Sequence, residues 1–143
     1  MSDVRRAAPS AGYSGTPLPR KLGIGPGARV AFVNAPDEFA AALGALPEDV
    51  TVRVRARGPL DVVVFFTVRR AELERRIQPL RAAVAPAGAL WVAWPKRASG
   101  VPSDMTEDVV REVALALGLV DTKVAAIDAT WSGLRLVVRR ELR

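Results

Sequence analysis

The chain has 143 residues, half of them apolar, and a net charge of +6 from 21 basic and 15 acidic residues. It contains no cysteine, which excludes disulfides and thiol chemistry, and no histidine, which removes the usual general base and the usual metal ligand. No apolar run approaches the roughly 18 residues that a membrane span needs. We therefore expect one cytoplasmic domain with a buried core, no bound metal and no membrane-spanning segment.

The N-terminal composition differs from that of the rest of the chain. Residues 1–15 are rich in Pro, Ser, Gly, Ala and Arg, and this composition predicts a disordered arm. Thr16 and Pro17 then predict the N-cap and the first position of a short helix, which Gly23 ends. The folded domain is expected to span residues 16–143.

Three strands are expected in the next part of the chain. Residues 28–34 are mostly apolar and predict an internal strand, after which Pro36 and two acids predict the start of a helix. Residues 50–55 alternate between apolar and polar, which is typical of an outer strand. Residues 61–66 begin with an aspartate and continue as an apolar run, which indicates a buried strand.

A long helix is expected after Thr67, which can cap it, because apolar residues then recur at helical spacing. Pro79 lies inside this pattern and predicts a kink or a break. Residues 88–95 follow as the central strand of the predicted sheet, with two tryptophans expected in its core. Lys96 opens the next loop, residues 96–101, which we call the Lys96 loop.

The C-terminal part predicts one helix and a hairpin. Asp104 and Glu107 have the spacing of a capping box, and Thr106 is the competing cap. Residues 120–128 and 131–139 predict two strands joined by a short link, here called the Trp131 hairpin. The alternation of strands and helices predicts a Rossmann-like α/β fold: a mostly parallel sheet of about six strands, helices on both faces and a C-terminal antiparallel β-hairpin.

This order of elements resembles the sheet of class I methyltransferases. Asp61 at a strand start, and the passage Leu80…Pro86-Ala-Gly88-Ala-Leu-Trp-Val, are similar to motifs of that family. One strand–helix unit of the methyltransferase fold is missing between Arg55 and Asp61. The resemblance implies a divergent enzyme that depends on S-adenosylmethionine.

A second resemblance runs over nearly the whole chain. It is carried by the segments Gly12-Tyr-Ser-Gly-Thr-Pro-Leu, Lys21-Leu-Gly-Ile, Trp94-Pro-Lys-Arg-Ala-Ser-Gly-Val, Thr106-Glu-Asp-Val-Val-Arg-Glu and Trp131-Ser-Gly-Leu-Arg. Together these segments resemble an actinobacterial family of short uncharacterised proteins, domain-of-unknown-function family 3052. The resemblance implies an actinobacterial origin and a compact domain, without an activity or site residues.

The candidate ligand site lies where the predicted strands end, because ligands of open α/β sheets bind beyond the carboxyl ends of the strands. If the strand of Trp131 pairs with the central strand, this edge gathers a pocket with cations, hydroxyls, a carboxylate and an aromatic wall. The candidate residues are Lys96, Arg97, Ser99, Thr106, Asp128, Trp131 and Ser132. Each also has an architectural interpretation, as a helix cap, a hairpin residue or part of the core.

A nucleotide cofactor meets an objection at the turn after the first strand. A dinucleotide or S-adenosylmethionine site favours glycines there, whereas this chain has Ala35 and Pro36, followed by two acids that would repel a phosphate. The acid that usually follows the second strand is also missing. Arg55 and Arg57 stand there instead, and they can either hold a phosphate or face solvent. We therefore expect no cofactor.

These observations favour a non-catalytic binding or regulatory module rather than an enzyme. It would hold a small anionic ligand or a protein partner through the Lys96 loop and the Trp131 hairpin, as a monomer or a homodimer. The first alternative is the methyltransferase-like enzyme. The second is a nucleic-acid-binding protein that uses the arginines of the long helix, namely Arg69, Arg70, Arg75 and Arg76.

Overall fold

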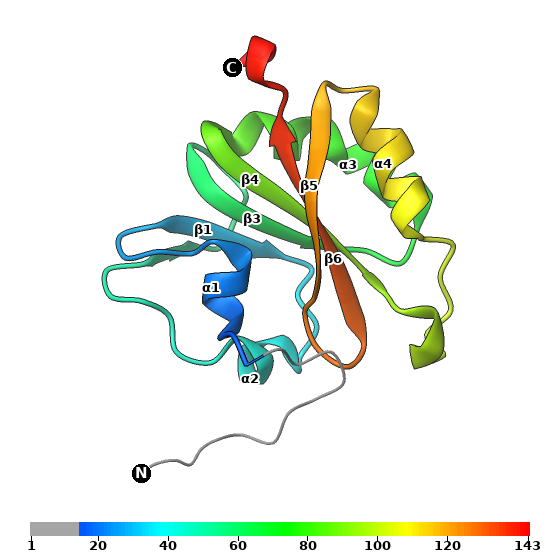
Figure 1. Cartoon of the computed structure of the whole chain (residues 1–143), viewed down its shortest axis with the longest axis horizontal. Coiled ribbons are helices and arrows are strands. Elements are labelled where there is room, and N and C mark those ends of the chain that lie inside the picture. The colour runs from blue at the N-terminus through cyan, green and yellow to red at the C-terminus, as the bar shows by residue number, and fades with distance from the viewer. Residues whose placement is uncertain (1–14) are drawn as a thin grey trace.

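A computed structural model describes residues 15–143 and shows six strands in one sheet (Figure 1). The strands are β1 (Arg29–Val33), β2 (Thr51–Arg53), β3 (Leu60–Phe66), β4 (Val84–Pro95), β5 (Leu119–Ala126) and β6 (Trp131–Val138). The helices are α1 (Leu18–Leu22), α2 (Phe39–Leu43), α3 (Arg70–Ala83) and α4 (Glu107–Leu115), with 3₁₀ turns at Arg97–Ser99 and Arg140–Leu142.

The strand order is β2-β1-β3-β4-β6-β5. The first four strands in this order are parallel, and β6 runs antiparallel to both of its neighbours. This confirms the predicted fold class, including the closing hairpin and the outer position of the alternating strand. The predicted disordered arm lies outside the described residues except for Gly15, and the domain boundary at residue 16 stays a prediction.

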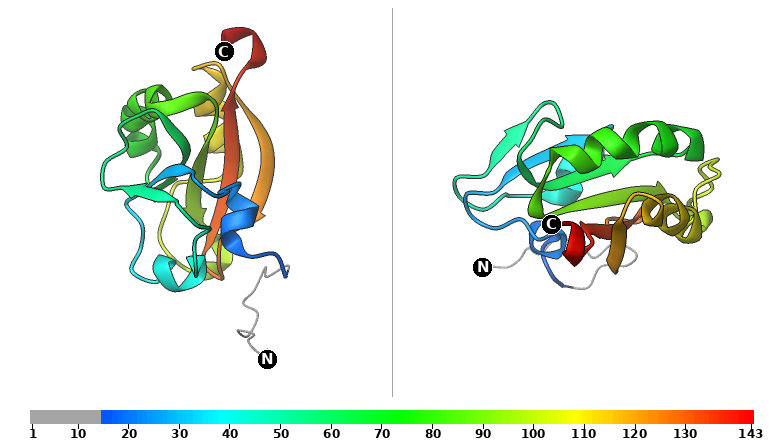
Figure 2. Two further views of the ribbon diagram at one scale, coloured as in Figure 1. Left: turned by 90° about the vertical axis from the view of Figure 1, so that its left-hand side faces the viewer. Right: turned by 90° about the horizontal axis from the view of Figure 1, so that it is seen from above.

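Helices cover both faces of the sheet. Helices α3 and α4 pack on one face, where Leu73, Ile77 and Val113 join the core with side chains of the central strands. Helices α1 and α2 pack on the other. Seen from above in Figure 2, α3 (green) and α1 (blue) lie on opposite sides of the sheet. In residues 15–143, no helix has the length and apolar character needed to cross a membrane.

Trp91, in the middle of β4, fixes α1 against the sheet. Its side chain is fully buried, and its indole N–H donates a hydrogen bond to the carbonyl of Leu22 at 3.0 Å. The indole lies against Gly133 of β6, where an added Cβ would stand only 3.0 Å from the Trp91 ring. A side chain at this position of β6 would therefore force the Trp91 ring to shift in a closely packed core.

The connection from β2 to β3 is short. Residues 54–59 pass over β1 on the α3 face, where Ala56 packs on the core and a Cβ on Gly58 would collide with the carbonyl of Ala83 in α3. No helix or further strand lies between β2 and β3, as expected from the unit missing between Arg55 and Asp61, and residues 54–59 join the two strands through bends.

Two predicted features of α3 differ in the structure. The helix begins at Arg70 with Arg69 as N-cap, so Thr67 does not cap it; the Asp104 carboxylate accepts the first helical N–H, that of Arg70, at 2.7 Å. The predicted break at Pro79 is wrong, because the helix continues to Ala83. Leu80 and Ala83 beyond the proline are buried, and this packing offsets the loss of one helical hydrogen bond.

The starts of α4 and α1 settle the other two predictions about helix caps. Thr106 caps α4, since its hydroxyl accepts the N–H of Val109 at 3.1 Å, and Asp104 is left to serve α3. Helix α1 begins one residue later than predicted, with Pro17 as N-cap and no side-chain cap, so Thr16 does not have the expected role.

The two buried tryptophans on the α1 face allow a matched test of the Trp91 hydrogen bond. Trp91→Phe removes the donor to Leu22, whereas Trp131→Phe removes an indole N–H that has no acceptor in the described part of the chain. We expect Trp91→Phe to lower the free energy of unfolding by about 1–3 kcal/mol more than Trp131→Phe, as measured by urea denaturation. Equal losses in the two variants would contradict the assigned role.

A pH-dependent ion pair joins the starts of β1 and β3. Asp61 accepts the backbone N–H of Arg29 at 2.8 Å and also binds its guanidinium, and these bonds hold the pKa of the Asp61 carboxyl below its usual value. A carboxyl with a lowered pKa stabilises the fold above its unfolded-state pKa, and this contribution is lost as the pH falls through the folded-state pKa.

Asp61→Asn should therefore be less stable than the parent at neutral pH, and the gap should close as the pH falls to about 2. Urea denaturation at several pH values measures this. Asp37→Asn, at an exposed carboxyl that forms no hydrogen bond or ion pair with the described residues, is the control and should show no such trend. A gap for Asp61→Asn that is constant with pH would refute the assignment.

Candidate functional site

The carboxyl ends of β1, β3 and β4 meet the start of β6 at one edge of the sheet, which we call the carboxyl edge. Three groups of polar contacts lie along it. The first follows β1 and β3, the second lies between the Lys96 loop and the Trp131 hairpin, and the third lies in the loop after β4. Within residues 15–143, no group of three or more acidic side chains is arranged to hold a metal ion.

The first group centres on Glu72, in the first turn of α3. Its carboxylate accepts hydrogen bonds from the Thr67 hydroxyl at 2.6 Å and from the Asn34 side-chain amide at 3.1 Å. The same amide also lies 3.2 Å from the carbonyl of Phe66. Asn34 has φ of 59°, a left-handed conformation that is rare outside glycine. The turn after β1 is therefore held in a strained conformation by contacts to β3 and α3.

The second group joins the Lys96 loop to the Trp131 hairpin. The Lys96 ammonium donates to the carbonyl of Asp128 at 2.8 Å, and the Lys96 backbone N–H donates to the carbonyl of Thr130 at 2.7 Å. The Asp128 carboxylate accepts the backbone N–H groups of Thr130 and Trp131, each at 2.8 Å. Both charged side chains thus stabilise the tip of the hairpin.

The third group ties the loop after β4 to the start of α3. The Ser99 hydroxyl donates to the carbonyl of Lys96 at 2.6 Å and so closes the 3₁₀ turn. Further along, the Ser103 hydroxyl and the Asp104 backbone N–H both donate to the carbonyl of Val68. Together with the Asp104 cap on α3, these bonds make the loop one unit with the first turn of that helix.

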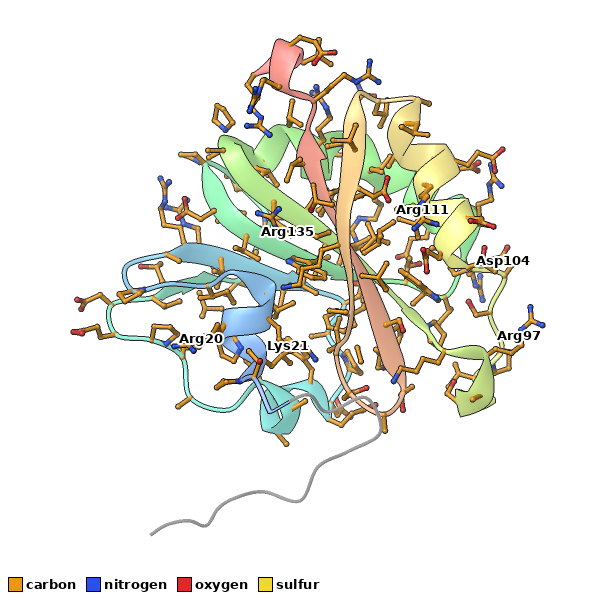
Figure 3. All side chains as sticks on the ribbon, viewed as in Figure 1. Arg20, Lys21, Arg97, Asp104, Arg111 and Arg135 are labelled. Carbon is orange, nitrogen blue, oxygen red and sulfur yellow. The ribbon has the colours of Figure 1, made fainter. Side chains whose placement is uncertain are left out.

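The structure brings four of the predicted site residues together. Pro95 pairs with Trp131 and Trp94 pairs with Ser132, as the hairpin prediction requires, and Lys96 contacts Asp128. Ser99 binds only its own loop. Arg97 is exposed and points away from the sheet, and Thr106 is exposed at the start of α4 (Figure 3). Ligand binding by this set stays a prediction.

An aromatic row lies beneath the carboxyl edge on the α1 face. Phe32, Phe39, Phe66 and Trp131 follow one another in edge-to-face contacts, with ring centres 4.9–5.3 Å apart. Trp131 is 8% exposed, and among the described residues its indole N–H has no acceptor. Buried donors are nearly always paired, so this one marks a place where a ligand or a water can supply the acceptor.

The candidate residues predicted from the sequence include neither Glu72 nor Asn34. The signal for the role of Glu72 was weak: an acid in the first helical turn, five residues after Thr67, is equally typical of a helix start. The left-handed turn at Asn34 leaves a faint trace in the sequence, because asparagine is among the residues that tolerate it best.

The arginines of α3 do not form one open cationic surface. The Arg70 guanidinium bonds with Glu74 at 3.0 Å and with Glu112 of α4 at 2.9 Å. Arg69 and Arg75 are exposed. The nucleic-acid alternative stays a prediction, with fewer unpaired cations than the sequence suggested.

No family model matches the chain, and no curated protein matches it significantly. The resemblance to the actinobacterial family 3052 therefore has no support. Solved structures match at the level of the fold. A SAM-dependent methyltransferase from Aquifex aeolicus has a TM-score of 0.58 and 12% identity, over 85% of this chain and 88% of that one.

Two further solved structures contain bound S-adenosylmethionine. Magnesium protoporphyrin IX methyltransferase from Synechocystis has a TM-score of 0.55 and 13% identity, over 85% of this chain and 74% of that one. Fibrillarin from Aeropyrum pernix has a TM-score of 0.54 and 12% identity, over 84% and 73%. The fold of this chain is the Rossmann-like fold that these proteins share.

This finding corrects the functional expectation drawn from the sequence. The interpretation as a non-catalytic module, and with it the preference against an enzyme, is overturned because the solved structures with this fold are methyltransferases. The expectation of no cofactor also loses support, because two of these proteins hold S-adenosylmethionine. The objection from the two acids concerned a phosphate, which S-adenosylmethionine does not carry, whereas the objection from the missing glycines concerned both kinds of cofactor.

The Glu72 contacts give a prediction that pairs two acids of α3. Glu72→Ala removes the acceptor of Thr67 and Asn34, so we expect a loss of about 1–3 kcal/mol in the free energy of unfolding. Glu74→Ala removes an exposed ion pair and should cost about 1 kcal/mol or less. Urea denaturation measures both, and faster amide exchange at Asn34 in Glu72→Ala alone is expected. Equal losses would contradict the assignment.

Proposed function

We propose that this chain is a shortened, divergent enzyme of the S-adenosylmethionine-dependent methyltransferase class, with its cofactor at the carboxyl edge. The fold, with β6 inserted between β4 and β5, supports the class through the methyltransferase structures that match it. The observation that carries the proposal is the acidic, left-handed turn that follows β1 at this edge.

The chemistry of this turn suits S-adenosylmethionine better than a dinucleotide. Pro36 has no N–H to offer a phosphate, and Asp37 and Glu38 are exposed acids. These features oppose a pyrophosphate. S-adenosylmethionine instead carries a sulfonium and an ammonium cation, which carboxylates attract. The two acids that argue against a phosphate thus favour this cofactor.

Residues of three elements would hold the cofactor. Asp37 and the Asn34 turn would bind its methionine end, and Glu72, whose oxygens retain further acceptor capacity, would add a third negative group. The unpaired indole N–H of Trp131 would donate to a polar atom of the bound molecule. When bound, the cofactor supplies an electrophilic methyl group.

The acceptor of the methyl group is not assigned by these residues. The Lys96 loop and the Trp131 hairpin border the same edge, and their predicted role in holding a ligand is retained as part of this proposal. The cytoplasmic location and the monomeric or homodimeric state stay predictions.

Binding of S-adenosylmethionine, its demethylated product and NAD to the full chain tests the proposal. The first two should raise the Tm by several degrees at about a hundred times their Kd, and NAD should not, because its pyrophosphate meets the acids. The double variant Asp37→Asn/Glu38→Gln should bind S-adenosylmethionine about tenfold more weakly in calorimetry, since two carboxylates are lost.

The chain offers a matched control for that variant. Glu48 and Asp49 form a second exposed acidic pair, and they precede β2 near Gly27, at the opposite edge of the sheet. Glu48→Gln/Asp49→Asn changes the net charge equally and should leave binding unchanged. The proposal fails if neither S-adenosylmethionine nor its product binds, or if both double variants lose the same affinity.

A further inference from the structure

A cavity of about 340 Å³ lies between α3 and the connection 54–59, on the face of the sheet where the strand–helix unit is missing. Three arginines line it, Arg55 and Arg57 from the connection and Arg76 from α3. The rest of the lining is apolar, from Val33, Val54, Ala56, Pro79 and Leu80. A small organic molecule fits a volume of this size.

The lining is cationic without compensation. It contains no carboxylate, and among the described residues none of the three arginine side chains forms an ion pair or a hydrogen bond. The guanidinium carbon of Arg76 lies 5.3 Å from the centre of the Phe65 ring, so this side chain is oriented by a cation–π contact. Arginines with free donors on an apolar wall are suited to bidentate binding of an oxyanion.

The connection that carries two of the arginines is held in place by its own contacts. The N–H of Arg57 donates to the carbonyl of Arg55 at 2.8 Å, and the guanidinium of Arg53 donates to the carbonyl of Arg57 at 3.2 Å. Gly58 lies directly against the carbonyl of Ala83 in α3. The backbone of the cationic wall is therefore fixed relative to α3, which reduces the entropic cost of binding.

A second basic hollow, of about 410 Å³, provides a contrast on the α1 face. Arg20, Lys21 and Lys123 line it, and Figure 3 shows Arg20 and Lys21 side by side there. Its lysines already have partners, because Lys21 donates to the carbonyl of Ala126 and Lys123 to that of Lys21. In the described part of the chain, all three arginines of the hollow on the α3 face lack acceptors, whereas in the second hollow Arg20 alone does.

From this arrangement we propose that the cavity on the α3 face binds a small organic molecule through a multiply charged oxyanion group, held by Arg55, Arg57 and Arg76. The charged group is a phosphate ester or a cluster of carboxylates, and the apolar wall contacts the organic part. Binding of the oxyanion does not require S-adenosylmethionine to be bound.

The cavity adjoins the carboxyl edge. Val33 lines the cavity and directly precedes Asn34, and Arg76 lies one turn of α3 beyond Glu72, on the same side of the helix. A molecule anchored by the arginines can therefore extend toward the Glu72 cluster. This places the anion site beside the site proposed for the cofactor without overlapping its acids.

Calorimetric titration of the full chain with phenyl phosphate and with citrate tests the proposal without any cofactor. We expect at least one anion to bind with a Kd of about 1 mM or tighter at moderate salt. Arg55→Gln, Arg57→Gln and Arg76→Gln should each weaken binding about tenfold, because each removes a charge-assisted hydrogen bond. Tighter binding of phenyl phosphate supports a phosphate ester as the natural group, and tighter binding of citrate supports a polycarboxylate.

Two control variants make the outcome decisive. Arg140→Gln removes an equal charge from an exposed position outside the cavity, and Lys123→Gln removes one from the hollow on the α1 face. Neither should change the affinity, and the Tm of every variant shows whether it is folded. Absence of binding by both anions overturns the proposal. So does an equal loss in Arg140→Gln, which indicates nonspecific attraction, or a loss confined to Lys123→Gln, which moves the site.

Discussion

Trp91, in the central strand β4, contacts both β6 and α1. Its indole fills the space over β6 that Gly133 leaves open, and its N–H donates a hydrogen bond to the carbonyl of Leu22, the last residue of α1. This one side chain thus limits the size of the residue on β6 and fixes the position of the N-terminal helix. The hydrogen bond joins residues 69 positions apart in the sequence, so it is a non-local contact of the kind that slows folding.

Most of the fold followed from the sequence because apolar runs and turn residues carry that information locally. The strand of residues 62–66 is buried on both faces and is apolar throughout, as its apolar run predicted. Helix starts were less predictable, because Asp104 caps a helix that begins 34 residues earlier in the chain. Local spacing cannot reveal a cap that comes from another element.

The candidate site was also predictable only in part. Lys96 and Asp128 were expected to be neighbours, because strand pairing places the ends of β4 and the hairpin together. Glu72 was not expected, because its contact with Asn34 depends on how α3 leans on the sheet. The significance of the Asn34 turn was also misjudged, since its acids were weighed against a phosphate rather than against a cation.

The brevity of the connection 54–59 has a consequence for how this fold can diverge. The cavity occupies the face of the sheet from which the strand–helix unit is missing, and the three cationic side chains around it come from the remaining walls. A variant with a helix inserted over β1 would fill this hollow and cover its arginines. The bound anion and the additional helix are thus mutually exclusive occupants of one surface, and loop length at this point is a determinant of ligand choice.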